Sequence, residues 1–156
     1  MELRFVKATI ADLDMLVETR IEVLRAANKL NDGTDMSEVE KESRVYYKRA
    51  LVDGSHVAIL VFEKDKFVGA GGVSFYAVMP TFHNHSGQRA YIMNMYTAPD
   101  YRRRGIAYHT LDLLIAECRK RNICQITLEA TQDGKYLYEK YGFSKMNDEM
   151  ELVTEK

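Results

Sequence analysis

The chain has 156 residues, 46% of them hydrophobic, which is enough for one domain with a sizeable core and leaves no room for a second enzyme-sized domain. Its 22 basic and 23 acidic residues give a net charge of -1, which excludes a whole-protein electrostatic attraction to nucleic acid or to an anionic membrane. We therefore expect a single domain over residues 1–156, in which any basic site is local.

The predicted elements begin with a strand and two helices. Residues 3–8 alternate with a period of two, as in a half-buried strand, and apolar residues then recur at helical spacing over 13–24. The stretch 28–37 has the composition of a loop. A second apolar face at helical spacing runs over 39–50, and Gly54 ends that helix.

The middle of the chain predicts a β-hairpin. Residues 57–62 are apolar on both faces, a charged turn covers 63–66, and the strand pattern returns over 67–78. A hairpin of this kind is expected in the middle of a sheet. Three glycines weaken the packing of its second strand, which predicts bends or the close approach of another group. These glycines are Gly69, Gly71 and Gly72.

A further strand is predicted over 90–97, after a loop over 80–89 that has no periodicity. Because neighbouring side chains of a strand point to opposite faces, simple alternation divides them into two sets. One face is expected to carry Ile92, Asn94 and Tyr96, and the other Tyr91, Met93 and Met95.

The last third predicts a helix over 105–121, a strand over 124–130, a short helix over 134–141 and one or two strands over 143–153. The order of elements indicates an α/β fold of the α+β type. Its central sheet is expected to be mixed and mostly antiparallel, with six to seven strands and about four flanking helices.

Nothing in the sequence predicts export or a membrane anchor. The N-terminus lacks the basic region and apolar stretch of a signal peptide, and no apolar run approaches the roughly 20 residues of a membrane-spanning helix. Cys118 and Cys124 do not form a Cys-x-x-Cys pair, and reduced thiols are their simplest interpretation. We expect a cytoplasmic protein.

The densest chemical information lies in residues 96–107, where a strand ends, three arginines and a glycine make a turn, and a helix begins. Such a turn leaves the first N–H groups of the helix unpaired at the positive end of its dipole, which makes an anion site. Gly105 allows a positive φ, and the arginines add charge-assisted hydrogen bonds. The alternative is a solvated charge cluster. Because the P-loop lysine motif and the Gly-x-Gly-x-x-Gly turn are absent, the site indicates a polyphosphate ligand of another kind.

Two motifs carry a resemblance to a known family. Residues 102–107, Arg-Arg-Arg-Gly-Ile-Ala, resemble the Gln/Arg-x-x-Gly-x-Gly/Ala signature of the GNAT superfamily of N-acetyltransferases. Residues 137–143, Leu-Tyr-Glu-Lys-Tyr-Gly-Phe, are similar to that family's Leu-Tyr-x-Lys-x-Gly-Phe element. The likeness also covers residues 96–101 and the strand over 126–130, so about the last third of the chain matches motif by motif, while the first two-thirds agree only in the order of elements. The resemblance implies a GNAT-like fold and the transfer of an acetyl group from acetyl-CoA, without a metal, to a primary amine of a small molecule or peptide.

In the GNAT family this turn holds the pyrophosphate of coenzyme A, and the backbone of the preceding strand hydrogen-bonds the pantetheine arm. The resemblance therefore implies a cofactor-binding set that consists of Met95, Tyr96, Thr97, Arg102, Arg103, Arg104, Gly105, Ile106, Ala107 and Tyr108. The side chains of Met95 and Tyr96 are expected in the core, because the contact uses the backbone. Tyr108 is larger than the residue often found there, so it either narrows the phosphate site or stacks on the cofactor.

The resemblance also implies two catalytic residues. Tyr138 aligns with the tyrosine that in many members protonates the leaving thiolate; its alternative is a packing role, like that expected for Tyr136 and Tyr141. Many relatives carry a glutamate two residues before the tyrosine of the strand that precedes the signature. Asn94 stands there in this chain, and it can orient a water but cannot accept a proton. The reserve candidates for the general base are Glu63, Glu129, His83 and His85.

The sequence does not name the acceptor. Specificity is expected to come from residues 20–49 and from the loop over 80–89. Acidic residues near the first of these segments are candidates for binding a cationic amine, unless they form solvated helix faces. They are Glu18, Glu22, Asp32 and Asp35.

Other functions compete with catalysis. The missing carboxylate at Asn94 leaves open a non-catalytic sensor or interaction module that binds acyl-CoA in the same fold. Use of the arginine turn for nucleic acid is disfavoured by the net charge. The sequence lacks the Gly-x-Ser-x-Gly elbow, the His-Glu-x-x-His helix and the cysteine-histidine metal cluster of other enzyme classes.

The cysteines bear on the mechanism of transfer. Neither of them sits in a nucleophile constellation, which favours direct transfer without a covalent enzyme intermediate. A homodimer is expected on base rate alone.

Overall fold

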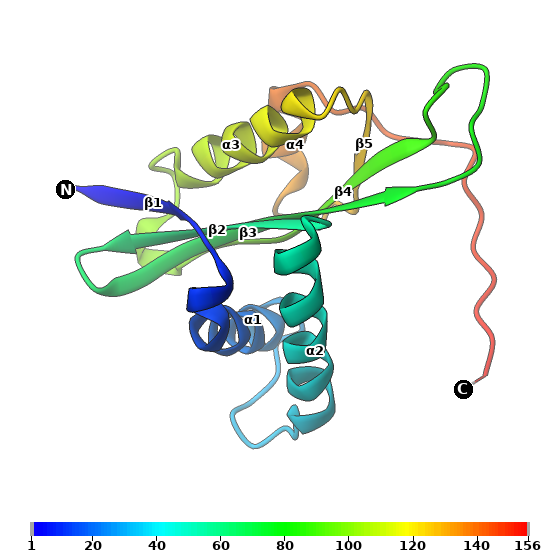
Figure 1. Cartoon of the computed structure of the whole chain (residues 1–156). Helices are drawn as coiled ribbons and strands as arrows, with labels where there is room; N and C mark the ends of the chain where they lie inside the picture. The colour runs from blue at the N-terminus through cyan, green and yellow to red at the C-terminus, as the bar shows by residue number, and fades with distance from the viewer. Residues whose placement is uncertain (1, 156) are drawn as a thin grey trace.

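The computed structural model describes residues 2–155, which form one sheet with helices on both of its faces (Figure 1). Within these residues the sheet has five strands in the order β1-β2-β3-β4-β5. They are β1 (Leu3–Lys7), β2 (His56–Glu63), β3 (Lys66–Ala77), β4 (Gln88–Thr97) and β5 (Gln125–Leu128). β1 to β4 pair antiparallel and β4 pairs with β5 in parallel, so the sheet is mixed, as predicted. The prediction of six to seven strands was wrong.

The missing strands belong to the C-terminal segment. Residues 143–155 form neither helix nor strand, and Figure 1 shows them leaving the domain as an extended trace. Met150, Leu152 and Val153 are exposed there. An alternating pattern fixes which side chains would share a face, but a strand also needs a neighbour that supplies its hydrogen bonds. This segment has no such neighbour among the described residues.

Four α-helices cover the sheet in the described part of the chain, as predicted, together with two short 3-10 helices. They are α1 (Leu13–Ala27), α2 (Ser37–Asp53), α3 (Ile106–Lys120) and α4 (Lys135–Tyr141), with η1 (Ile10–Asp12) and η2 (Pro99–Tyr101). α1 and α2 lie on one face of the sheet, and α3 and α4 lie on the other (Figure 1). None of these helices is both long enough and apolar enough to cross a membrane.

Local sequence explains where the first helices begin and end. Thr9 Oγ1 accepts a hydrogen bond from the backbone N–H of Ala11, and the Asp12 carboxylate accepts one from the N–H of Thr9, which forms a capping box before α1. α2 ends at Gly54, whose φ of 80° is a left-handed conformation that glycine adopts without strain.

The sheet separates two hydrophobic cores. The α3 core lies between the sheet and α3 and includes Ile59, Val61, Ile92, Leu111 and Leu114. The second core lies between the sheet and α1 and α2 and includes Leu16, Val17, Tyr47, Ala58 and Leu60. Because alternate residues of β2 enter the two cores, this strand is apolar on both faces, and its predicted place in the middle of the sheet is confirmed.

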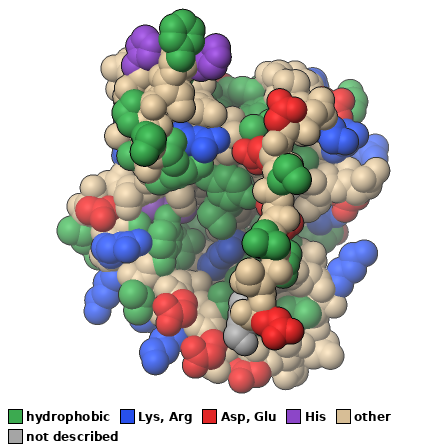
Figure 2. All heavy atoms as spheres, turned by 90° about the vertical axis from the view of Figure 1, so that its right-hand side faces the viewer, with side chains coloured by type: hydrophobic (Ala, Val, Ile, Leu, Met, Phe, Trp, Pro, Cys, Tyr) green, Lys and Arg blue, Asp and Glu red, His purple; other side chains and the backbone are tan. Residues whose placement is uncertain are grey.

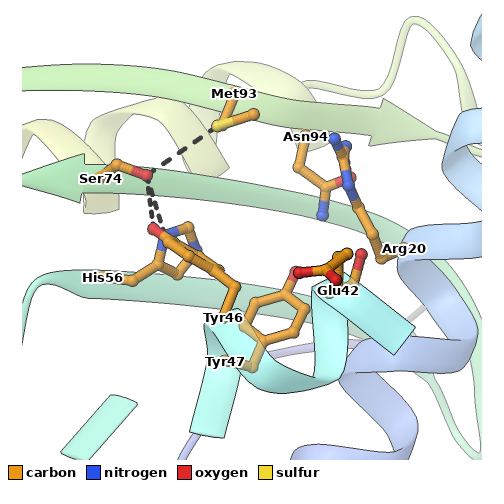
Figure 3. A pocket seen from close by; sticks show the side chains of 9 residues that line it. Arg20, Glu42, Tyr46, Tyr47, His56, Ser74, Met93 and Asn94 are labelled. Carbon is orange, nitrogen blue, oxygen red and sulfur yellow. Dashed lines mark hydrogen bonds between the residues drawn. The ribbon is translucent and has the colours of Figure 1, made fainter. Parts of the chain in front are cut away.

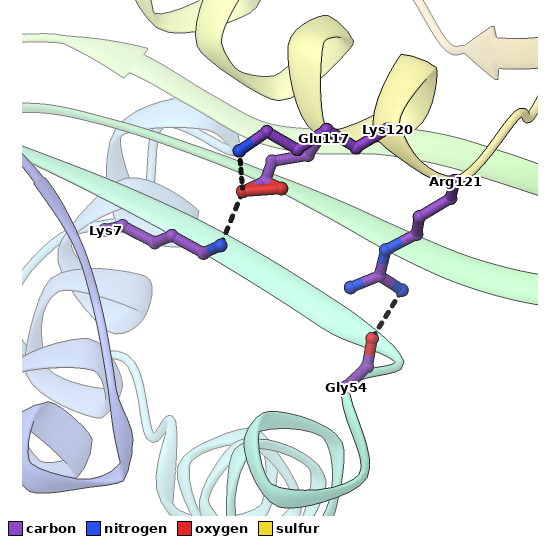
Figure 4. A network of polar contacts seen from close by, with 5 residues as sticks. All are labelled: Lys7, Gly54, Glu117, Lys120 and Arg121. Carbon is purple, nitrogen blue, oxygen red and sulfur yellow. Dashed lines mark hydrogen bonds and ion pairs between the residues drawn. The ribbon is translucent and has the colours of Figure 1, made fainter.

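Polar contacts hold the C-terminal end of α3 (Figure 4). Lys7 and Lys120 both pair with the Glu117 carboxylate, with N–O distances of 2.5 and 3.7 Å. Arg121 donates a hydrogen bond to the backbone carbonyl of Gly54 at 2.6 Å. These contacts join the end of α3 to β1 and to the turn after α2, so the helix has a fixed orientation across the sheet.

β4 contains a bulge opposite Gly71. Ala70 pairs with Tyr96, and Gly72 pairs with Met93, so β4 has one residue more than β3 between these two pairs. Asn94 lies in the bulge with a φ of 61°, a left-handed conformation that asparagine tolerates better than most residues.

The bulge changes the faces that the β4 side chains occupy. Met93 and Asn94 both face α1 and α2, whereas Met95 packs against the α3 core. Tyr96 lies on the α1 and α2 side, where it stacks on a ring of the second core. The prediction that Asn94 and Tyr96 share a face with Ile92 was therefore wrong, because simple alternation does not allow for an inserted residue.

Candidate active site

β4 has an unpaired edge where it reaches the candidate site. Its parallel pairing with β5 begins at Arg89 and stops at Ile92. Residues 93–97 have no partner in β5, so their outward backbone groups are open to a ligand, apart from the Thr97 carbonyl, which accepts a hydrogen bond from Arg102. Three residues predicted to bind the cofactor through the backbone lie on this edge, namely Met95, Tyr96 and Thr97.

The edge leads into the arginine turn and the N-terminus of α3. Arg103 and Gly105 have φ values of 63° and 79°, and the exposed turn ends where α3 begins at Ile106. The N–H of His109 donates to the carbonyl of Gly105 at 3.0 Å, which is the first hydrogen bond of the helix. The N–H groups before it have no partner within the helix and lie at the positive end of its dipole, so they suit an anion.

Two arginines of the turn contact residues around it. Arg102 Nε donates to the backbone carbonyl of Thr97 at 3.3 Å, which joins the turn to the end of β4. The guanidinium of Arg104 lies over the ring of Tyr101, 5.2 Å from its centroid. The positive charges predicted from the sequence are thus placed beside the unpaired edge.

The other predicted residues of the signature have different surroundings. Ile106 is buried in the α3 core and anchors the start of the helix, and Ala107 is half-buried. Tyr108 packs against Tyr141, with 5.1 Å between the ring centroids, and Lys140 Nζ lies 5.9 Å from the Tyr108 centroid. Tyr108 therefore joins α3 to α4.

Tyr138 comes from α4, on the same side of the sheet as α3. Its side chain is 8% exposed and packs in the α3 core, with its ring centroid 6.0 Å from that of Phe143. Gly134 gives it room, because a Cβ there would lie 3.0 Å from the ring. Burial raises the pKa of the Tyr138 phenol, so the phenol keeps its proton at neutral pH, as a general acid must.

The two neighbouring tyrosines of α4 differ from each other. Tyr136 is 78% exposed, so the packing role expected for it was wrong, because α4 buries only one face. Tyr141 does pack, against Tyr108 and Phe143, and its hydroxyl donates to the Asp112 carboxylate at 2.8 Å.

A cavity of about 270 Å3 lies on the opposite face of the sheet, against α1 and α2 (Figure 3). It is lined by Arg20, Glu42, Ser43, Tyr46, Tyr47, His56, Ser74, Met93 and Asn94. Met93 and Asn94 reach it because of the β4 bulge, and they are also the first two residues beyond the pairing with β5. The cavity and the unpaired edge therefore share this segment of β4.

Asn94 is held from the cavity side by Arg20 of α1. Arg20 Nη1 donates a hydrogen bond to Asn94 Oδ1 at 2.9 Å (Figure 3). The amide oxygen thus receives a charged donor, and the amide nitrogen stays available as a donor to another group.

His56 is a cavity residue that was not among the predicted site residues. Its Nδ1 lies 2.8 Å from Tyr46 Oη and 3.2 Å from Ser74 Oγ, and these two oxygens are 2.7 Å apart (Figure 3). Burial, with the positive charge of Arg20, lowers its pKa to about 4, so the imidazole is neutral at neutral pH. Gly72 makes room for the ring, since a Cβ there would lie 2.9 Å from His56 Nε2.

The reserve candidates for the general base do not line the cavity. Glu63 accepts a hydrogen bond from Tyr101 Oη at 2.5 Å, which ties the end of β2 to η2. Glu129 is exposed just after β5. His83 and His85 lie against an exposed aromatic ring in the β3–β4 connection. Figure 2 shows histidine side chains beside a hydrophobic one at the top of the face it presents.

The acidic residues predicted to bind an amine also lie outside the cavity. They are Glu18, Glu22, Asp32 and Asp35. Asp35 instead accepts a hydrogen bond from the backbone N–H of Ser37 at the start of α2. The carboxylate that lines the cavity belongs to Glu42, which the sequence did not single out.

The part of the chain that the structure describes contains no metal cluster, and its buried cysteine is not an activated thiol. No three His, Cys, Asp or Glu side chains lie together in a way that could hold a metal ion. Cys118 is buried, and burial raises the pKa of its thiol to about 11, so it is not a nucleophilic thiolate at neutral pH. Cys124 is exposed.

Comparisons with known proteins show the family and the fold of the chain. The model of the acetyltransferase (GNAT) family matches residues 22–143. The chain is 32% identical to a predicted acetyltransferase from Clostridium acetobutylicum, crystallised with acetyl-CoA, with a TM-score of 0.88 over 97% of this chain and 96% of that one. It is 25% identical to a GCN5-related N-acetyltransferase from Ralstonia eutropha JMP134, with a TM-score of 0.81 over 97% and 99% of the two chains.

A more distant structure shares the fold alone. Glucosamine-6-phosphate N-acetyltransferase from Arabidopsis thaliana is 17% identical, with a TM-score of 0.71 over 99% of this chain and 100% of that one. Among curated proteins, no sequence matches the chain.

Proposed function

The chain belongs to the GNAT acetyltransferase family, and from this premise we propose that it transfers an acetyl group from acetyl-CoA to a primary amine of a small molecule or peptide. The observation that carries the proposal is the path along the unpaired β4 edge, through the arginine turn, to the N-terminus of α3. The similar protein from Clostridium acetobutylicum, crystallised with acetyl-CoA, supports this choice of acetyl donor.

The residues along this path suit coenzyme A. A diphosphate is an anion, and the turn offers it the first N–H groups of α3 with Arg102 and Arg103 beside them. The pantetheine arm contains amides, which can pair with the open backbone of residues 93–97 as a strand would. When bound, acetyl-CoA supplies a thioester, whose acetyl carbon accepts the amine and whose sulfur leaves as a thiolate.

Tyr138 is the proposed general acid. Its phenol is protonated at neutral pH, and α4 holds it on the side of the sheet where the signature helix lies. In the overall transfer a C–N bond forms and the C–S bond breaks. The phenol proton goes to the departing sulfur, the nitrogen that has attacked releases a proton to solvent, and the Tyr138 phenolate regains a proton from solvent.

Asn94 is the residue that we propose helps to deprotonate the incoming amine. With its oxygen fixed by Arg20, its amide nitrogen can orient a water that takes the proton of the incoming ammonium. The positive charge of Arg20 also disfavours the protonated amine beside it. Asn94 and Arg20 together thus replace the carboxylate that the family pattern leads one to expect.

The second candidate function is a non-catalytic sensor or interaction module that binds acyl-CoA. The observation that favours it is that neither Asn94 at the bulge nor the nearby His56 is an effective base. Asn94 cannot take a proton, and His56, with a pKa of about 4, is a weak base.

Calorimetric titration with acetyl-CoA, followed by thiol release against a panel of primary amines, separates the two functions. Micromolar binding with amine-dependent release supports the transferase. Binding without release from any amine supports the sensor, and failure to bind acetyl-CoA overturns both. Initial-rate lines that intersect support direct attack, whereas parallel lines indicate a covalent enzyme intermediate.

A further inference from the structure

Arg20 brings a positive charge into the cavity without a carboxylate partner. None of the ion pairs among residues 2–155 involves it, and its hydrogen-bond partner there is the neutral side chain of Asn94. Arg20 is itself half-buried. A partly buried guanidinium has lost some of its water, so an anion that enters the cavity gains more from it than from an arginine on the surface.

The other groups that line the cavity do not neutralise this charge. His56 is neutral, and burial raises the pKa of Tyr47 to about 12, so its phenol is neutral too. The lining carboxylate, that of Glu42, is exposed on α2 and forms no ion pair with Arg20. The positive charge of Arg20 at the bulge is therefore not neutralised by direct contact with another cavity residue.

The geometry leaves Arg20 free to bind a second group. A guanidinium has five N–H donors in a planar fork, and Asn94 uses the Nη1 side of it. The remaining donors fit the two oxygens of a carboxylate or a phosphate. Asn94 joins this anion site to the β4 bulge, where the proposed transfer takes place.

We propose that the acceptor is a primary amine that also carries an oxyanion, a carboxylate or a phosphate, and that Arg20 binds the oxyanion while the amine lies at Met93 and Asn94. This inference rests on the proposed transferase function. It gives Arg20 a second role, as a specificity-determining residue that binds the acceptor's oxyanion, beside its hydrogen bond to Asn94.

The first test compares acceptors with and without the oxyanion, over a range of pH, so that each kcat/KM is referred to the free amine. The panel contains L-amino acids with their carboxamides, and phosphoethanolamine with ethanolamine. We expect kcat/KM for an anionic acceptor to exceed that for its neutral partner by about 10- to 100-fold, the range of a charge-assisted contact. Comparison of the carboxylate pairs with the phosphate pair shows which oxyanion is bound. Equal kcat/KM within every pair, or a preference for neutral or dicationic amines, overturns the inference and leaves the transferase standing.

Variants assign the preference to Arg20. Arg20→Gln should abolish it, by lowering kcat/KM more for the anionic acceptor than for its neutral partner. Asn94→Asp should abolish it as well, because a carboxylate then neutralises Arg20 from the position that Asn94 holds at 2.9 Å. Arg44→Gln is the matched control, since Arg44 lies on α2, pairs with Asp14 at 2.7 Å and does not line the cavity. A preference that survives in Arg20→Gln contradicts the assignment.

A binding measurement keeps the inference testable if no acceptor is acetylated. In NMR spectra of the wild-type protein, the same anionic probes should shift the Nε–Hε signal of Arg20 and the side-chain amide signals of Asn94, whereas their neutral partners should not. With such shifts and no turnover, the proposed transferase is wrong and the anion site stands. If no anionic probe shifts these signals, the anion site is rejected whatever the activity.

Discussion

Arg20 donates a hydrogen bond to Asn94 Oδ1 across 2.9 Å, and this contact fastens α1 to the bulge of β4. The two residues are 74 positions apart in the sequence. Their contact holds in place the segment of β4 that the cavity and the unpaired strand edge share. The asparagine has two roles there, because its backbone takes the left-handed conformation and its side chain meets the guanidinium.

Two substitutions of Asn94 separate these roles. Asn94→Gly keeps a backbone that accepts φ of 61° and loses the amide, whereas Asn94→Ala loses the amide and adds backbone strain of about 1 kcal/mol. We expect both to lower kcat/KM by about 10-fold, the loss of one charge-assisted hydrogen bond. We also expect only the alanine variant to show the additional loss of stability in urea unfolding. A glycine variant with the wild-type rate at every pH would show that the side chain has no part in the reaction.

Tyr138→Phe removes the proposed acid and little else. Burial raises the pKa of this phenol, and its packing in the α3 core uses the ring. We expect kcat to fall by about 100-fold, as for loss of a general acid, and the alkaline limb of the pH profile to change, with nearly wild-type stability. Tyr136→Phe is the control, because Tyr136 lies on the same short helix and is exposed. An unchanged kcat and pH profile in Tyr138→Phe would exclude the acid role.

The arginine turn predicts salt-dependent binding of acetyl-CoA. Arg102→Gln and Arg103→Gln should each raise Kd by about 10-fold and reduce its dependence on salt, since each removes one charge beside the diphosphate site. Arg119→Gln removes the same charge from the last turn of α3, at the opposite end of the helix, and should leave Kd unchanged. Titration calorimetry at low and high salt measures both effects. If all three variants bind alike, the turn does not hold the phosphates.

Gly72 is expected to be intolerant of a side chain. A Cβ there would lie 2.9 Å from His56 Nε2 and 3.0 Å from Cε1, so Gly72→Ala must displace a buried ring and should cost about 1–3 kcal/mol of unfolding free energy. Gly33→Ala is the comparison, because its nearest contact is the Asn31 side chain at 3.4 Å in an exposed loop. Urea unfolding of the two variants gives the difference. Equal stability would show that the His56 ring moves without cost.

His56 predicts how stability changes with pH. Its folded pKa of about 4 lies below the ordinary histidine pKa of 6.5, so the unfolded state binds this proton first as the pH falls. The free energy of unfolding should therefore decrease between about pH 6.5 and about pH 4, by about 2 kcal/mol at about pH 5 from this group alone. His56→Gln should flatten that part of the curve, with His83→Gln on the exposed loop as the control. A variant curve parallel to that of the wild type would contradict the assignment.

Much of the signature region was predictable because its signals are local. A strand that stops, a glycine with positive φ and a new apolar period together fix the start of α3 at Ile106. The bulge at Asn94 was not predictable, because a period of two does not show where one residue is inserted. The terminal strands failed for a related reason, since a pattern over 143–153 does not reveal whether a partner edge exists.

The cavity depends on contacts between distant segments, so the sequence shows it only in part. Residues 20–49 were expected to determine specificity, and Arg20 and Glu42 of that stretch do line the cavity. His56 lies directly before an apolar run, and nothing in the local sequence predicts which side chains it contacts. The available signal was Gly72, whose missing side chain predicted the close approach of another group.

The end of β5 pairing at Ile92 makes β4 an interior strand for one part of its length and an edge strand for the rest. Backbone protons that point away from β3 should therefore exchange with heavy water slowly in residues 90–92 and quickly in residues 93–97. A ligand arm lying along the edge would act as the missing neighbour and slow only the second group. Hydrogen exchange along β4 would then show whether a ligand is bound at the edge, without a chemical label and whether or not any acceptor is acetylated.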